Sequence, residues 1–380
     1  MWCPKLEYSG IHCSRSECKS ECKRLRCFLN RNLPLHKAPV IESFRLESCS
    51  SHFKPENISM WVGNAVSHCV RELDILHDDT DPAKSNILPS NLFTCKSLVI
   101  LKLEGDILLD VPRMVSLPSL KTLKLQDVRY FKDGTLQRLL SSCPILEDLV
   151  VDLREGETTG KLTVLDAYLQ SLSIYIPYDH GIDELVIQTP DLKYFKLRLH
   201  SCNDHYCLIE NMPNLIEAYL DVELLDISSL IGSITSVKRL TICSEAMNDV
   251  TFVFNQLEYL EVCLCTVLFT NQLVRLLKAS SNLQGLDISF MDHHEPLGMD
   301  EWVQPSTVPE CVLSSLQSLS WSTYTGEPQE RDIVVYILKH ALHLKTATIK
   351  SSESAVPKFD MLKELSLSSR ASAACQLIFE

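Results

Sequence analysis

The sequence predicts an α/β solenoid built from short parallel strands, and three observations support this prediction. A six-residue phrase, Leu-x-x-Leu-x-Leu with aliphatic substitutions, begins at Leu98, Leu120 and Leu146 and returns along the chain. Most of its spacings lie in or near the ~20–29 residues typical of leucine-rich repeats. Prolines precede several of the phrases. We therefore expect a leucine-rich-repeat solenoid, with a curved parallel sheet on the concave face and irregular helices and loops outside.

The phrase buries three apolar side chains in each repeat. Side chains of an extended segment alternate between faces, so Leu123 and Leu125 share one face and Leu120 turns inward at the strand entrance. One repeat cannot cover this apolar face, so neighbouring repeats must stack. Fourteen phrases argue against unrelated strands of an ordinary α/β protein. Their first positions are Ile41, Val70, Leu98, Leu120, Leu146, Leu169, Leu192, Leu215, Val237, Leu257, Leu283, Leu316, Leu344 and Leu362.

Prolines and short amphipathic segments fill the connections between phrases. A proline lacks a backbone donor, so it is tolerated where a strand begins. The segments 134–140 and 271–278 have helical periodicity, and we expect Leu139, Leu140, Leu276 and Leu277 to face the core. Four prolines lie shortly before a phrase: Pro118, Pro144, Pro190 and Pro213.

Composition argues against nucleic-acid and membrane partners. The formal net charge is −13, from 36 basic and 49 acidic residues, and no basic stripe accompanies it. The short basic cluster 19–31 is typical of a solvated segment. There is no apolar run of about 18 residues, which a membrane span would need. Residues 1–12 lack the apolar run of a secretory signal, so we expect a cytoplasmic or nuclear protein with reduced cysteines.

Three groups of cysteine and histidine residues invite a metal interpretation, and the sequence favours none of them. The N-terminal cysteines contain no Cys-x-x-Cys pair, and structural zinc sites usually have two tight ligand pairs. The segments 202–207 and 292–295 are more typical of polar loops. We therefore expect neither a metal nor a cofactor. Four further cysteines are expected to pack as small apolar groups: Cys95, Cys143, Cys243 and Cys263.

The chain contains no phosphate-binding loop, no nucleophile elbow and no His-Glu-x-x-His pair, so we expect no enzyme and no catalytic residues. Solenoids use an extended surface for binding. Aromatic and charged side chains that flank the buried phrase positions are typical of binding hot spots. The alternative is an ordinary solvated sheet face. The candidate binding residues on the concave face are Tyr194, Lys196, Arg198, Glu217, Tyr219, Asp221, Tyr259 and Glu261.

The C-terminal segment carries a series of spaced anchors. It has an amphipathic helix at 333–341 and a closing apolar strand with Leu377 and Phe379 that could cap the solenoid. The anchors in order are Trp302, Pro305, Val308, Pro309, Cys311, Leu316, Trp321, Tyr324, Gly326, Tyr336, Leu338, Ala341, Leu344, Ile349 and Cys375. This series closely resembles the FBD domain of plant F-box/leucine-rich-repeat proteins, and the segment 35–46 is similar to the one that opens the repeats in that family.

The resemblance implies a substrate-recognition part of a Skp1-cullin-F-box ubiquitin ligase that binds a target protein of unknown identity. Residues 1–29 lack the Leu-Pro start and Ser-Lys-Arg-Trp-like end of an F-box, which argues against docking of a Skp1-like adaptor. The alternatives are a binding or decoy protein without a ligase role and a small-ligand receptor. The predicted organisation is a poorly defined leader over 1–29, irregular repeats over 30–290, a linker over 291–309 and the FBD domain over 302–380.

Overall fold

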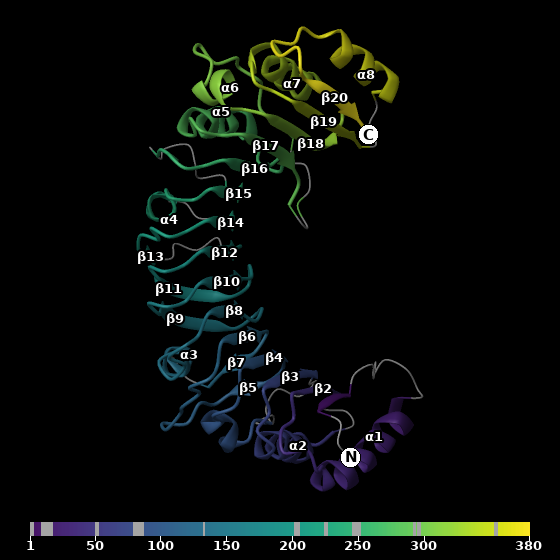
Figure 1. Ribbon diagram of the computed structural model, residues 1–380, viewed down its shortest axis with the longest axis vertical. Coiled ribbons are helices and arrows are strands. Elements are labelled where there is room, and N and C mark those ends of the chain that lie inside the picture. Colours follow the sequence, from purple (N-terminus) through teal and green to yellow (C-terminus); the bar gives the residue numbers. More distant parts are fainter. Residues whose placement is uncertain are drawn as a thin grey trace. The chain divides into compact units, whose positions relative to one another are not determined.

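In the computed structural model, the chain forms two compact units. Figure 1 labels the helices and strands of both units. The N-terminal unit comprises residues 1–192 and 205–209, and the C-terminal unit comprises residues 193–204 and 210–380. The residues that the structure describes are 4–8, 18–49, 53–78, 87–131, 134–200, 206–223, 227–244, 252–291, 294, 298–352 and 356–380.

The N-terminal unit contains a parallel sheet whose strands follow one another in chain order. Each strand from β2 onward begins within or just after a predicted phrase, and the inward side chains are fully buried, as Leu101 and Leu103 illustrate. The strands are β1 (Lys5–Tyr8), β2 (Ser43–Cys49), β3 (Glu72–Asp78), β4 (Ile100–Gly105), β6 (Thr122–Gln126), β8 (Asp148–Asp152) and β10 (Ser171–Ile176).

The connections of this unit combine helices with further strands. The predicted helix at 134–140 is confirmed as α3 (Thr135–Leu140), and Leu139 and Leu140 are buried as expected. A second parallel sheet was not predicted from the sequence. It consists of β9 (Thr158–Leu165), β11 (Gly181–Gln188) and β13 (Tyr206–Ile209). The remaining elements are α1 (Cys18–Asn32), α2 (Pro55–Ser67), β5 (Leu108–Leu109), β7 (Arg129–Tyr130) and the 3₁₀ helices Leu33–Leu35 and Ser90–Thr94.

The C-terminal unit repeats the same construction. The helix predicted at 271–278 is confirmed within α5 (Phe269–Ala279), and the one predicted at 333–341 is confirmed as part of α7 (Pro328–His340), which ends one residue earlier. The other helices are α4 (Ser228–Ser233), α6 (Glu310–Ser314) and α8 (Lys358–Leu367). Its parallel strands are β12 (Tyr194–Leu199), β14 (Glu217–Val222), β15 (Arg239–Cys243), β16 (Tyr259–Cys263), β17 (Gly285–Ser289), β18 (Ser318–Tyr324), β19 (Thr346–Ser351) and β20 (Gln376–Phe379).

The prolines before the phrases have a specific structural role. The N–H of Leu120 donates to the Leu117 carbonyl at 3.2 Å, and that of Leu215 donates to the Met212 carbonyl at 3.1 Å, so each pair closes a four-residue turn. The proline occupies the second position of that turn, where its fixed φ is favourable and no donor is needed. The prolines therefore stabilise the tight turn that immediately precedes each of these strands.

The phrase at Leu362 does not form a strand, and this prediction is wrong. Residues 358–367 form helix α8, which begins after Pro357 and buries Met361 and Leu365. Leucines three residues apart also share one face of a helix, so the phrase alone does not distinguish the two structures. The last parallel strand is β20, which includes the predicted closing residues Leu377 and Phe379 and pairs with β19.

Within residues 1–29, where the sequence predicts a poorly defined leader, the structure describes strand β1 and most of helix α1. Strand β1 pairs in parallel with β2, with Leu6 beside Phe44. Leu6 and Leu29 are both buried. The predicted domain boundaries themselves stay a prediction. Among the described residues, none of the helices combines the length and the apolar character that crossing a membrane would require.

The end of strand β4 depends on a glycine. Gly105 has φ +90°, and a Cβ at this position would lie 2.3 Å from the His77 carbonyl oxygen. Gly134 also has a positive φ, of +75°, but a Cβ there would meet no atom within 4 Å. The two glycines thus share the left-handed conformation and differ in the space around them.

We expect Gly105→Ala to lower the free energy of unfolding by about 2–4 kcal/mol, since left-handed strain adds to a clash with backbone. The matched variant Gly134→Ala carries only the strain and should cost about 1 kcal/mol. Urea unfolding followed by circular dichroism measures both. Equal losses would contradict the role given to the His77 carbonyl.

Candidate binding face and a Cys–His cluster

The sheet of the C-terminal unit places the predicted binding residues on one face. Counting from the first apolar position of each phrase, they occupy the third, fifth and seventh positions, which point away from the buried fourth and sixth. The parallel register sets Tyr194 beside Glu217 and Lys196 beside Tyr219. Equivalent positions therefore form rows across adjacent strands, and we call this surface the open face.

Cation–π pairs hold the aromatic side chains of the open face. Lys196 Nζ lies 4.5 Å from the centroid of the Tyr219 ring, and Arg239 Cζ lies 4.4 Å from that of Tyr259. Such contacts contribute about 0.5–1 kcal/mol each at exposed sites. Arg239 was not among the predicted residues, although it occupies the third position of its phrase. The pairs fix the tyrosine rings before any partner arrives.

The Tyr259 ring lies over a glycine. A Cβ on Gly285 would lie 2.8 Å from Tyr259 Cδ2, so only glycine leaves room for the ring in this position. The Tyr259 hydroxyl donates to Asp287 Oδ2 at 3.1 Å. Burial, followed by the charge of Asp287, raises the pKa of Tyr259 above its ordinary value. The ring is therefore anchored at its edge, at its hydroxyl and by the guanidinium beside it.

A second set of hydrogen bonds fixes Glu261. The Thr241 hydroxyl donates to Glu261 Oε2 at 3.1 Å, and the Ser289 hydroxyl donates to Oε1 at 2.7 Å. Both donors lie on the strands that flank β16. The carboxylate thus keeps a defined position on the open face, although it is partly exposed.

Asp221 differs from the other predicted residues because it is buried, with 2% of its surface exposed. Its carboxylate lies 3.2 Å from His200 Nε2, 3.2 Å from His294 Nε2 and 3.5 Å from Arg198 Nε. Burial opposes its ionisation, but the hydrogen bond with His200 and the nearby positive charges hold its pKa below the ordinary value. Asp221 is therefore a support beneath the open face and not a surface group.

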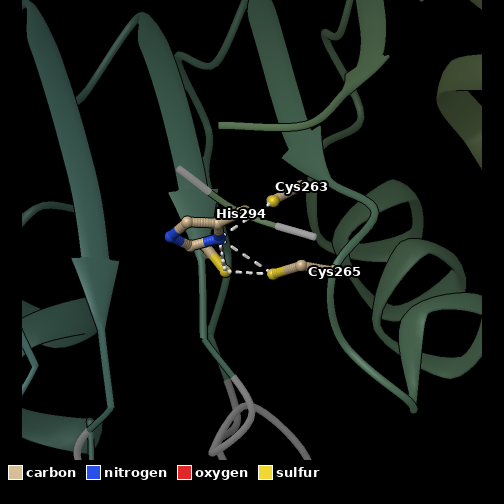
Figure 2. Close-up of side chains that lie close together, drawn as sticks. Cys263, Cys265 and His294 are labelled. Carbon is tan, nitrogen blue, oxygen red and sulfur yellow. Dashed lines mark hydrogen bonds between the residues drawn. The ribbon is translucent and has the colours of Figure 1, made fainter. Parts of the chain in front are cut away.

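The seventh positions of the next two phrases continue this row with two cysteines. Cys243 and Cys263 directly follow the paired residues Ile242 and Val262 on β15 and β16. Met291 completes a small buried cluster with them, apart from the leucine core. Cys265 lies two residues beyond Cys263, and His294 follows β17 in the chain. Figure 2 shows Cys263, Cys265 and His294 close together. We call Cys243, Cys263, Cys265 and His294 the Cys–His cluster.

The cluster shows what the sequence reasoning missed. Cys243 and Cys263 were expected to pack as small apolar groups, and both are buried, but they lie on the open face and not in the core between the strands and helices. His294 was expected in a polar linker. The usable signals were cysteines at the seventh position of adjacent phrases and the Cys263-x-Cys265 pair.

The structure describes only some of the cysteines in the other two candidate metal groups, the segment 202–207 and the N-terminal cysteines. Cys202 and His205 lie outside the described residues, and Cys207 belongs to β13. Near the N-terminus, Cys22 is buried and Cys27 is exposed. Cys3 and Cys13 lie outside the described residues.

The N-terminal unit carries an acidic hollow at the carboxyl ends of β3, β4, β6, β8 and β10, with a volume of about 680 Å³. Its seventh-position row includes Glu104 and Asp152. Burial, followed by the charge of Asp74, raises the pKa of Glu104. Burial also raises the pKa of Asp127; Arg154 partly opposes this rise, and the charge of Asp106 adds to it. Arg154 forms an ion pair with Asp106 at one side. The hollow therefore favours a positively charged group.

Comparison with known protein families identifies both parts of the chain. A family model described as the leucine-rich repeats of FBD-associated F-box protein At5g56370 matches residues 58–215. A second model, described as FBD, matches residues 304–349.

Individual relatives extend the similarity over the whole chain. FBD-associated F-box protein At4g10400 of Arabidopsis thaliana is 57% identical over 380 residues, which cover 100% of this chain and 90% of the relative. FBD-associated F-box protein At5g38590 of Arabidopsis thaliana is 49% identical, over 96% of this chain and 88% of the relative. Putative F-box/FBD/LRR-repeat protein At5g62970, also of Arabidopsis thaliana, is 42% identical over 94% of this chain and 82% of the relative. The chain therefore belongs to the plant family of FBD-associated F-box proteins with leucine-rich repeats.

Proposed function

We propose that this protein is a non-catalytic recognition module that binds a target protein through the open face of its repeats. The observation that carries the proposal is the anchored pair of rings, Tyr219 and Tyr259, each beside a cation on adjacent parts of one sheet. Aromatic side chains fixed in advance lose little conformational entropy on binding, which is why they dominate interface hot spots.

In the context of its family, the bound protein would be selected for ubiquitination by a Skp1-cullin-F-box ligase in the cytoplasm or nucleus. The support is the name that its relatives carry, F-box protein, together with a repeat surface suited to protein binding. The alternative is a binding or decoy protein that holds the same target without a ligase. The two differ in the fate of the target and not in how it is bound.

The charge of the chain favours a basic segment in the target. The net charge is −13, and the hollow of the N-terminal unit collects carboxylates whose pKa values are raised by burial. A lysine or arginine side chain of the partner would relieve this repulsion and speed the encounter.

We expect the double variant Tyr219→Ala/Tyr259→Ala to weaken target binding about 10- to 100-fold, because truncation of two anchored hot-spot residues costs about 1.4–3 kcal/mol. The target is first identified by quantitative capture with the full chain from plant cells, with and without a proteasome inhibitor, and its affinity for the purified chain is then measured. Tyr168→Ala is the matched control, because Tyr168 is 69% exposed and belongs to the N-terminal unit, whereas the open face was defined on the C-terminal unit. An equal loss in both variants would contradict the proposed surface.

The ligase role is tested separately, with the same variants expressed in plant cells. Under the ligase role, wild-type chain co-purifies with a Skp1-like adaptor, although residues 1–29 lack the F-box features, and shortens the lifetime of the target. The double tyrosine variant should then keep the adaptor and lose the effect on the target. Target binding without adaptor binding or target ubiquitination would support the decoy alternative.

The acidic hollow yields a prediction about ionic strength. Glu104→Gln/Asp127→Asn should weaken target binding about threefold to tenfold at low salt, and the difference should shrink as added salt screens the charges. Glu21→Gln/Glu56→Gln removes the same charge from the first turns of α1 and α2 and serves as control. A salt-independent loss, or the same loss in the control, would argue against a basic segment in the hollow.

A further inference from the structure

We propose that the Cys–His cluster binds a structural zinc ion, which fastens the segment after β17 onto the edge of the open face. Three thiols and one imidazole each offer one ligand atom, and all of these atoms lie within 4.8 Å of one another. Three cysteines with one histidine form one of the ligand sets of tetrahedral structural zinc sites. Four protein ligands fill the coordination sphere, so the ion would hold structure and leave no position for a substrate.

The distances fit a tetrahedron around one small ion. His294 Nδ1 lies 3.0 Å from Cys265 Sγ, 3.5 Å from Cys263 Sγ and 3.6 Å from Cys243 Sγ. Ideal zinc bonds of about 2.3 Å to sulfur and 2.0–2.1 Å to nitrogen give nitrogen–sulfur edges of about 3.6 Å. The dashed lines in Figure 2 trace the contacts among these groups.

Two edges of the tetrahedron must lengthen, and both involve Cys265 Sγ: the 3.0 Å edge to His294 Nδ1 and the edge to Cys243 Sγ. Cys243 Sγ lies 3.1 Å from Cys265 Sγ, whereas a zinc site with the same bond lengths has sulfur–sulfur edges of about 3.8 Å. Cys265 lies in the turn after β16 and is partly exposed, so its side chain can make this shift.

The scaffold brings the ligands together from three consecutive repeats. Cys243 and Cys263 end neighbouring parallel strands at the same register, which fixes the separation of their side chains. Cys265 follows in the next turn. Cys243 and Cys263 are carried on strands and are positioned before the ion binds, whereas Cys265 lies in a turn and His294 follows β17.

Asp221 supplies the support that metal-bound histidines usually have. Its carboxylate oxygens lie 3.2 Å from His294 Nε2, so Nε2 carries the proton and Nδ1 turns its lone pair toward the thiols. A carboxylate behind a ligating imidazole fixes both its tautomer and its orientation. The backbone N–H of Met291 donates to Cys263 Sγ at 3.5 Å, a contact that stabilises a thiolate.

The chemistry of the donor set selects the ion. A divalent ion displaces the thiol protons of Cys243, Cys263 and Cys265 to solvent and neutralises two of the three thiolate charges. Soft thiolates with imidazole favour zinc over magnesium or calcium, which prefer oxygen.

The primary test is the metal content of the full chain, purified under reducing conditions without chelator. We expect about one zinc per chain by elemental analysis, and well under half of that in Cys263→Ser and in His294→Ala. Cys311→Ser is the matched control, because Cys311 is another buried thiol of the same unit and donates to the Leu277 carbonyl at 3.1 Å. It should retain its zinc.

Cobalt provides a readout that does not depend on how the chain was purified. Addition of Co²⁺ to the reduced, metal-free chain should give the visible bands of tetrahedral cobalt with thiolate-to-cobalt charge transfer, and zinc should abolish them. A wild-type chain that carries no zinc and gives no such spectrum would overturn the proposal. Isolation of the chain with a Cys243–Cys265 disulfide that forms in place of metal binding, detected by mass spectrometry, would overturn it as well.

Asp221→Asn tests the support behind His294. This variant keeps the size of the side chain but removes its charge, and we expect zinc affinity to fall about 10- to 100-fold in competition with a chromophoric chelator. Unchanged affinity would refute the positioning role of Asp221.

Removal of the ion should also lower stability. Free zinc at about 100 times the dissociation constant of the site raises the unfolding temperature of a unit of this size by about 5–10 °C. A strong chelator should therefore lower the unfolding temperature of the wild type by that amount. Cys263→Ser, already without the ion, should show no further shift. The same fall in both proteins would contradict the site.

Discussion

The stacking of parallel strands in one common register is the constraint on which the rest of this structure depends. A single phrase such as that at Leu120 cannot cover its three apolar side chains, so each strand must pair with the next at equivalent positions. This shared register has a second consequence. Once the fourth and sixth positions point into the core, the third, fifth and seventh are forced into rows on the opposite face. The core therefore decides where every surface group of the sheet stands.

The parts of the fold that follow from this constraint could be predicted from the sequence. Thirteen of the fourteen phrases enter strands, because an apolar side chain at every second position suits a buried sheet face. The exception at Leu362 forms a helix after Pro357, and its leucine spacing suits either structure. The outer strands β9 and β11 were missed because connections between phrases follow no fixed pattern. Their pairing depends on which segments the stack brings side by side.

Part of the candidate site also follows from the alternation of side chains along each strand, and part does not. Alternation alone placed Tyr219 and Tyr259 on the open face, and the register then explains why each meets a cation from a neighbouring strand. The Cys–His cluster could not be predicted in this way. His294 and Asp221 are 73 residues apart in the chain and meet only because His294, which follows β17, lies against side chains of β14, β15 and β16. Ligand spacing along the sequence carries no sign of such a return.

The seventh-position row shows how one scaffold produces different surfaces. In the N-terminal unit this row carries Glu104 and Asp152 beside a hollow, and its carboxylates repel one another. In the C-terminal unit the seventh positions are Asp221, Cys243 and Cys263, and the side chains of Met291 and His294 pack against them. Because the leucine core does not depend on what stands at these outward positions, the row can change without cost to the stack. A repeat protein that must recognise a particular partner can therefore vary this row while the apolar phrase stays constant. Fastening the segment of His294 at one edge would then give a fixed border to a surface whose tyrosines are already held in place.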